Sequence, residues 1–145
     1  MKFTSARLAQ DLSRLALSKK ATDIKVLDVR KLTDVTDFLV VCSASADMHG
    51  RAIADTLEQE MAKHKVKVWH NEGYSRGEWI LLDFVDVVVH IFLDETRRFY
   101  NLEGLWGDAP HKTLSENGRF SVKSSRIAKK SKSTRRKIVK RKKVR

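Results

Sequence analysis

Apolar residues recur at every third or fourth position in two stretches of the chain, and this period predicts two amphipathic helices. The first is expected over residues 5–19, and the second from an N-cap at Ser45 to about His64. The apolar positions are Leu8, Leu12, Leu15 and Ala16 in the first helix and Ile53, Leu57 and Met61 in the second. Each helix therefore has one apolar face that must pack against another element.

Runs that are alternating, β-branched or continuously apolar predict five strands. These strands are residues 24–29, 38–42, 66–69, 79–84 and 87–93. Only Val85 and Asp86 separate the last two strands, and this short connection predicts an antiparallel hairpin. Residues 71–77 are rich in Gly, Asn and Ser and are expected to form the turn before the fourth strand.

A last helix is expected after Asp94, which can cap its first turn. Its apolar face would hold Phe99, Leu102, Leu105 and Trp106. In chain order, the predicted elements are a helix, two strands, a helix, three strands and a helix. This order predicts an α/β fold in which helices pack on a mixed β-sheet.

Charge divides the chain into two parts at residue 110. Residues 1–110 hold 15 Lys and Arg against 17 Asp and Glu, whereas residues 111–145 hold 15 against one acid, Glu116. The first part is therefore interpreted as a near-neutral α/β domain. The second part has too few apolar residues to offset the entropy of ordering, so we expect a basic, disordered tail.

Clustered cations in the tail favour binding to RNA phosphates through the release of counterions. The residues expected to contact nucleic acid are Lys129, Lys130, Arg135, Arg136, Lys137 and Arg141. No aromatic residue follows Phe120, so we do not expect base stacking or sequence-specific reading by the tail. A solvated tail without a dedicated role and a tail for anionic membrane surfaces are the two alternatives.

Composition excludes several classes of protein. A single cysteine, Cys42, rules out an intramolecular disulfide framework and a multi-cysteine metal site. No apolar run approaches the ~18 residues that span a bilayer. Residues 1–5 are followed by an amphipathic pattern and lack the apolar core of a signal peptide. We therefore expect a soluble, cytoplasmic protein with no membrane association.

Three features are candidates for chemistry, and each also has an ordinary structural explanation. Asp83, Asp86 and Asp94 could hold Mg²⁺ at a sheet edge, but Asp is common beside hairpin turns and this interpretation is favoured. His90 is interpreted as a hydrogen-bonded core or interface residue. Cys42 lies in an apolar strand, where burial suppresses thiol reactivity. No catalytic residue, metal site or cofactor is therefore predicted.

Alternation along residues 79–84 predicts a strand that is largely apolar on both faces. Trp79, Leu81 and Asp83 point to one face, and the residues between them point to the other. One face must pack under the helices, so the other needs further cover or a partner. Trp and Tyr beside charged residues are typical anchors of protein interfaces, which favours a partner.

Three segments closely resemble those of a known family. Asp83–Phe92 and Arg98–Trp106 are similar to the hallmark segment of the ribosomal silencing factor (Iojap-related) family. Thr36–Ser45 is similar to the strand and loop that lie upstream in that family. The resemblance covers about residues 5–110, so the basic tail lies outside it.

The resemblance implies an α/β fold similar to that of nucleotidyltransferases, without their activity. Residues 42–45 lack the Gly-Ser pair with which such an enzyme would hold phosphates. Family members bind the large ribosomal subunit through its protein number fourteen and sterically block joining of the small subunit, especially under nutrient limitation. The chain is then expected to be a translational repressor and not an enzyme, present as a monomer or weak homodimer.

Eight residues of the domain are expected to contact that partner. They are Glu72, Trp79, Leu81, Asp83, Asp86, Tyr100, Glu103 and Trp106. Trp79 and Leu81 would be apolar anchors, and the acids would face a basic ribosomal surface. Two other functions stay open at this point: a factor for assembly of the large subunit, and a divergent nucleotidyltransferase that uses Asp83 and Asp86.

Overall fold

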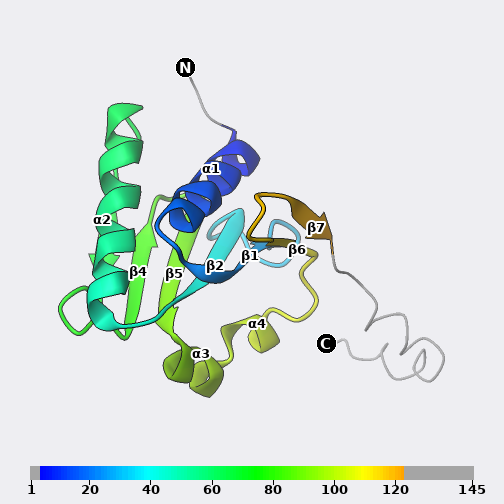
Figure 1. Cartoon of the computed structure of the whole chain (residues 1–145). Coiled ribbons are helices and arrows are strands. Elements are labelled where there is room, and N and C mark those ends of the chain that lie inside the picture. Colours follow the sequence, from blue (N-terminus) through cyan, green and yellow to red (C-terminus); the bar gives the residue numbers. More distant parts are fainter. Residues whose placement is uncertain (1–3, 123–145) are drawn as a thin grey trace.

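The computed structural model describes residues 4–122, in which helices pack on a single mixed β-sheet (Figure 1). The strands are β1 (Thr22–Asp28), β2 (Phe38–Ala44), β3 (His70–Glu72), β4 (Trp79–Asp83), β5 (Val87–Leu93), β6 (His111–Leu114) and β7 (Phe120–Val122). Their order across the sheet is β3-β4-β5-β2-β1-β6-β7. Among these described strands, only β2 and β5 pair in parallel, and the predicted β4–β5 hairpin is antiparallel. The predicted α/β fold is confirmed.

Two long helices cover one face of this sheet, while two short ones lie at its end (Figure 1). The helices are α1 (Ser5–Ser18), α2 (Asp47–Lys63), α3 (Asp94–Tyr100) and α4 (Leu102–Leu105). The Thr4 hydroxyl caps α1 by accepting a hydrogen bond from the amide of Arg7 at 3.0 Å. In the part of the chain that the structure describes, no helix is long and apolar enough to cross a membrane.

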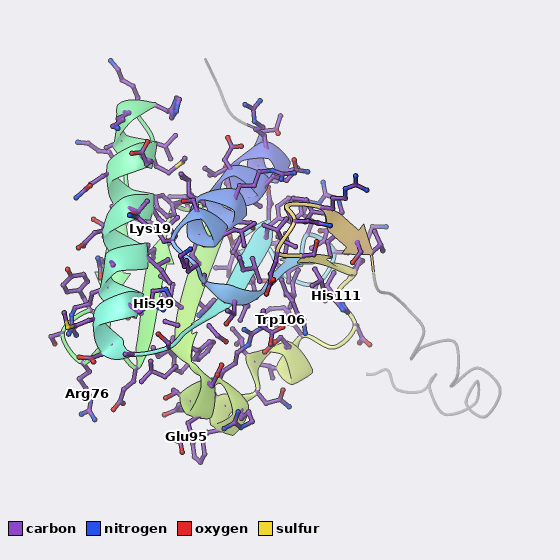
Figure 2. All side chains as sticks on the ribbon, in the orientation of Figure 1. Lys19, His49, Arg76, Glu95, Trp106 and His111 are labelled. Carbon is purple, nitrogen blue, oxygen red and sulfur yellow. The ribbon has the colours of Figure 1, made fainter. Side chains whose placement is uncertain are left out.

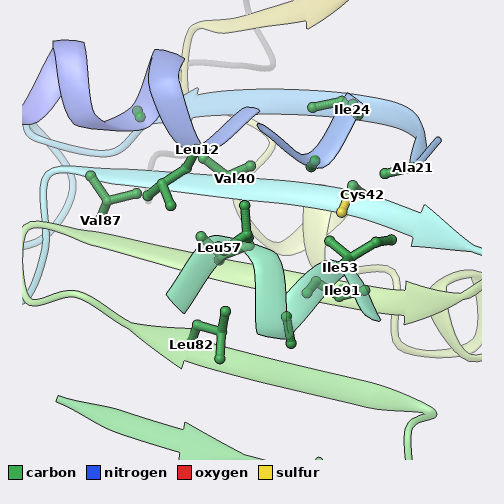
Figure 3. Packing of buried hydrophobic residues seen from close by; sticks show 14 of the residues in the cluster. Leu12, Ala21, Ile24, Val40, Cys42, Ile53, Leu57, Leu82, Val87 and Ile91 are labelled. Carbon is green, nitrogen blue, oxygen red and sulfur yellow. The ribbon is translucent and has the colours of Figure 1, made fainter. Parts of the chain in front are cut away.

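The main core lies between the sheet and the two long helices. Leu12 of α1, with Ile53 and Leu57 of α2, contributes fully buried side chains to it (Figure 3). These side chains pack with Val40 of β2 and Ile91 of β5 in the same cluster. The apolar faces predicted for the two helices are therefore confirmed, and they leave the opposite face of the sheet without a long helix.

The N-terminus of α2 differs from the predicted N-cap. The cap residue is Ala46, whose side chain makes no capping hydrogen bond. Ser45 instead contacts His49: its backbone N–H donates to His49 Nδ1 at 2.9 Å, and its hydroxyl lies 3.1 Å from the same atom. The cap of α3 differs as well, since Leu93 is the N-cap and Asp94 is the first helical residue. Both helix starts are therefore shifted by one residue from the predicted ones.

The third strand lies later in the chain than predicted. Residues 66–69 do not form a strand, although Val66 and Val68 pack against the core. The first hydrogen bond to β4 is donated by the backbone N–H of Trp69 to the carbonyl of Asp83, at 2.7 Å. The antiparallel pairing with β4 then continues over His70–Glu72. Part of the predicted turn is therefore the edge strand, because pairing with β4 and not local β-propensity fixes its place.

The predicted last helix is broken at Asn101. This residue has a left-handed φ of 47°, which ends α3, and its side chain then accepts from the amide of Gly104 to begin α4. Asn adopts this conformation more readily than most residues. The break changes which side chains are buried: Phe99 and Leu105, predicted on the apolar face, are 79% and 75% exposed.

The folded unit extends past the predicted boundary at residue 110. Strand β6 pairs with β1, and β7 pairs with β6, so residues 111–122 continue the sheet and do not belong to a disordered tail. Leu114 is buried in the core, and Arg14 of α1 lies over the Phe120 ring and donates to the carbonyl of Gly118 at 2.7 Å. The boundary at residue 110 was predicted from the charge and apolar content of the following residues. It missed this hairpin because a few apolar contacts are enough to dock the hairpin on the domain. Residues 123–145 lie outside the described part of the chain.

Candidate docking surface

A sheet face without long helices holds four of the eight predicted contact residues. Residues opposite each other in paired strands point to the same face, and the register pairs Glu72 with Leu81 and Leu81 with His90. We call this the open face. It consists of His70, Glu72, Trp79, Leu81, Asp83, Val88 and His90. Its members alternate with the buried residues that pack beneath α1 and α2.

The other half of the same sheet face is covered by the segment that follows α3. Leu102 and Trp106 pack on a small cluster that includes Leu39, Val41 and Ala109. Trp106 lies at the end of α4 (Figure 2). This cover ends beside β5, so Trp79, Leu81 and Val88 stay half-buried. The sequence predicted that this face needs either cover or a partner. The part over β1 and β2 is covered by the segment after α3, whereas the part over β4 stays partly exposed.

Trp79 joins the open face to α3 through an aromatic cluster. Its ring centroid lies 4.9 Å from that of Phe92, 4.7 Å from that of Tyr100 and 5.9 Å from that of His90. Its indole N–H donates to His90 Nδ1 at 3.0 Å. Rings at such separations stabilise one another beyond their buried area. Trp79 and Tyr100, two predicted contact residues, are thus brought together on one surface.

His90 is a buried, neutral member of this cluster. It is 6% exposed, and burial lowers the pKa of its imidazole to about 4. The ring is therefore uncharged at neutral pH, and its Nδ1 accepts the hydrogen bond from Trp79. The sequence interpretation of His90 as a hydrogen-bonded histidine in an apolar strand is confirmed.

Three of the predicted acids lie on the open face or at its edge. Glu72 and Asp83 lie on β3 and β4, and the carboxylate of Asp83 accepts from the amide of Val85 at 2.8 Å in the hairpin turn. Asp86 is exposed at the same turn. The turn interpretation of Asp83 is confirmed, and among residues 4–122 no group of three or more His, Cys, Asp and Glu side chains is placed to hold a metal ion.

Glu103 is engaged in an ion pair and does not extend the acidic rim. Its carboxylate lies 2.7 Å from Arg97 Nη2 and 4.0 Å from Lys25 Nζ. Burial raises the pKa of Glu103, but the hydrogen bonds and charge of Arg97 lower it by more, so the net pKa lies below its usual range. The carboxylate is therefore held as an anion beside β1.

Arg97 is the residue of this region that sequence reasoning missed. Its side chain is only 7% exposed, and its Nη1 donates to the carbonyl of Asp23 at 2.9 Å and to the Ser43 hydroxyl at 2.7 Å. With the bonds to Glu103, it ties α3 and α4 to β1 and β2. Arg97 is therefore a structural residue that connects these elements through its hydrogen bonds. No pattern in the sequence predicts this role, because its partners are far apart in the chain.

The lone cysteine lies in the core, away from the open face. Cys42 is fully buried on β2, and burial raises the pKa of its thiol to about 12. A thiol in this state is a poor nucleophile, which confirms the interpretation of Cys42 as an inert core residue. The predicted tail contacts, from Lys129 to Arg141, lie outside the described residues.

Together, the fold and the open face define a small α/β protein with a sheet surface suited to binding another macromolecule. A family model described as "Ribosomal silencing factor during starvation" matches residues 2–143. The chain belongs to this family of ribosome-associated regulators of translation.

Individual relatives agree with the family model. The ribosomal silencing factor of Halalkalibacterium halodurans is 36% identical over 105 residues, which are 70% of this chain and 90% of that protein. The chloroplastic Iojap protein of Zea mays is 42% identical over 101 residues, 70% of this chain but only 44% of that protein. A crystal structure of a Chromobacterium violaceum protein, 34% identical, matches with a TM-score of 0.63 and covers 68% of this chain and 86% of its own. The family predicted from the sequence is confirmed.

Proposed function

We propose that the chain binds the large ribosomal subunit through its protein number fourteen and sterically blocks joining of the small subunit, especially under nutrient limitation. The observation that carries this proposal is the open face, a half-buried apolar strip bordered by acids. Trp79, Leu81 and Val88 supply the strip, and Glu72 and Asp83 lie on the same face. Such a strip is suited to a protein partner with a basic rim.

A steric block requires no bond to be made or broken. It requires only that a rigid surface occupy the place of the small subunit, and the open face is built on regular strands of the sheet. Trp79 packs against the rings of His90, Phe92 and Tyr100, so little side-chain freedom is lost when it docks. We therefore propose a translational repressor that acts as a binding protein in the cytoplasm, as a monomer or weak homodimer.

Truncation of Trp79 tests the docking surface. Trp79→Ala should weaken binding of the full chain to purified large subunits by more than about 2 kcal/mol, a loss typical of an anchor at the centre of an interface. Leu81→Ala, which leaves the aromatic cluster in place, should weaken binding by a smaller amount. Co-sedimentation at a series of subunit concentrations measures both affinities.

Met48→Ala provides the control, because this exposed apolar side chain lies on α2, on the helix-covered side of the sheet. It should bind as the parent chain does. Thermal unfolding of each variant shows that the fold is retained. Unchanged affinity in folded Trp79→Ala and Leu81→Ala would exclude the open face as the docking surface, whereas binding of the parent chain to neither subunit would exclude the function itself.

A further inference from the structure

The tautomer of His90 is fixed by its neighbour on the adjacent strand. The indole N–H of Trp79 is a donor only, so the atom that receives it, Nδ1 of His90, has to be an acceptor without a proton. A neutral imidazole carries its proton on one of its two nitrogens. The proton of His90 therefore sits on Nε2.

This Nε2–H donor has no acceptor among residues 4–122, although the residue is 94% buried, as its 6% exposure shows. Buried polar groups without a hydrogen-bond partner are rare in folded proteins, and each calls for an explanation. The backbone of β5 does not supply an acceptor for Nε2–H, because the N–H and C=O groups of this strand pair with β2 and β4. The chain thus holds an oriented Nε2–H donor on the open face with no protein acceptor among residues 4–122, so only solvent can pair with it in the free chain.

The position of His90 indicates what could pair with it. It lies opposite Leu81 of β4 and two residues from Val88, and both of these side chains are half-buried on the open face. A partner seated on these two side chains also covers His90 and excludes water from it. Without an acceptor from the partner, docking would leave the donor fully desolvated.

We propose that Nε2–H of His90 donates a hydrogen bond to a carbonyl oxygen of the docked partner. The acceptor is a neutral carbonyl and not a carboxylate, because Glu72 and Asp83 on the same face repel an anion. This inference rests on the proposed function and deepens it, since it names one atom through which the open face selects its partner. A surface without an acceptor at that point would be rejected.

Two substitutions separate the donor from the packing of the ring. The amide of Asn stays near the position of Nδ1 and can still accept from Trp79, whereas the longer Gln carries an amide N–H to about the position of Nε2. His90→Asn should weaken binding of the full chain to purified large subunits about tenfold, the effect of one unsatisfied buried donor. His90→Gln should lose less affinity than His90→Asn, because an amide N–H again lies near the position of Nε2, even though the Trp79 indole N–H loses Nδ1 as its acceptor. His64→Asn, the same exchange at an exposed position after α2, is the control.

Histidine NMR gives a second measurement that needs no variant. In the free chain labelled with ¹⁵N-histidine, His90 should show a protonated Nε2 and an unprotonated Nδ1. On addition of isolated ribosomal protein number fourteen, the Nε2 proton should move downfield as it gains an acceptor. A protonated Nδ1, or an Nε2 proton that does not shift in the complex, would overturn the inference.

The binding data distinguish the two levels of the proposal. If the parent chain binds and Trp79→Ala weakens binding while His90→Asn binds as the parent does, the donor role is wrong and the docking surface stands. If His90→Asn and His90→Gln lose equal affinity while folded, His90 does not act as a donor. If the parent chain does not bind the large subunit, both the function and the inference fail.

Discussion

At the scale of single residues, burial of His90 makes the free energy of unfolding depend on pH. The imidazole has a pKa of about 4 in the folded chain, against its ordinary value of 6.5. Between these values the unfolded state binds a proton that the folded state does not, so acid favours unfolding. His90 should therefore contribute a loss of about 2 kcal/mol of stability between about pH 7.5 and about pH 5.

Denaturant unfolding of the parent chain and of His90→Gln at the two pH values measures this effect. The variant cannot titrate at position 90, so its stability should fall less on acidification, by about 2 kcal/mol. Glu103 and the other titrating groups are common to both chains and cancel in the difference. Parallel losses in the two chains would show that His90 is protonated equally in both states.

The sequence predicted residues whose placement follows from alternation along one strand. Trp79, Leu81 and Asp83 share a face because side chains alternate along β4, and one hairpin fixes them opposite β5. The bond from Trp79 to His90 and the bonds of Arg97 could not be predicted in this way. The hydroxyl that Arg97 meets lies 54 positions away in the chain, on another strand, so only the packed fold brings the two together.

At the scale of elements, α3 and α4 depend on one buried link. Arg97→Met would leave Glu103, whose side chain is 26% exposed, as an anion without its main partner. We expect a loss of about 2–3 kcal/mol of stability, less than for a fully buried pair because Glu103 is partly hydrated. Arg98→Met, the same exchange at the exposed neighbour, should cost little. Chemical denaturation measures both.

A double-mutant cycle tests whether Arg97 and Glu103 act together. Because Glu103→Gln removes the charge that Arg97→Met leaves unpaired, the double variant should be less destabilised than the sum of the two single variants, by about 1–2 kcal/mol. Hydrogen exchange should quicken at Gly104 and Trp106, whose amides are bonded within α4 and its preceding turn, before it quickens in β5. Additive effects would mean that the two side chains stabilise the fold independently.

The long elements were predictable and the short ones were not, for a physical reason. Helices α1 and α2 each have buried apolar residues at a helical spacing over several turns, so the sequence predicts which face of each helix is buried. Strands β3 and β7 have three residues each and depend on the strand beside them. The break at Asn101 is set by a single left-handed residue, which a periodic pattern over residues 99–106 does not show.

At the scale of the whole molecule, the two faces of the sheet have different roles: one contributes to the main core and the other is the proposed binding surface. One face is covered by α1 and α2 and provides the main core, while the other is only partly covered, by Leu102 and Trp106. Because β2 and β5 are central and buried on the helix side, substitutions on the open face can change binding without opening the main core. The proposed docking surface is therefore the outer side of strand β4, whose inner side contributes Ile80 and Leu82 to the main core.

The basic segment after β7 gives the last prediction, because 13 of its 23 residues, 123–145, are Lys or Arg. If these cations follow ribosomal RNA near the docking site, the affinity of the full chain for the large subunit should fall steeply with salt. A chain that ends at Val122 should bind with a shallower slope, reduced by roughly 0.7–0.9 for each phosphate that these cations would otherwise neutralise. The cut belongs after Val122, because a cut at residue 110 would remove β6 from its pairing with β1. A chain of full length with Gln in place of these cations separates the effect of charge from that of length, and equal salt slopes in all three chains would exclude an RNA contact by this segment.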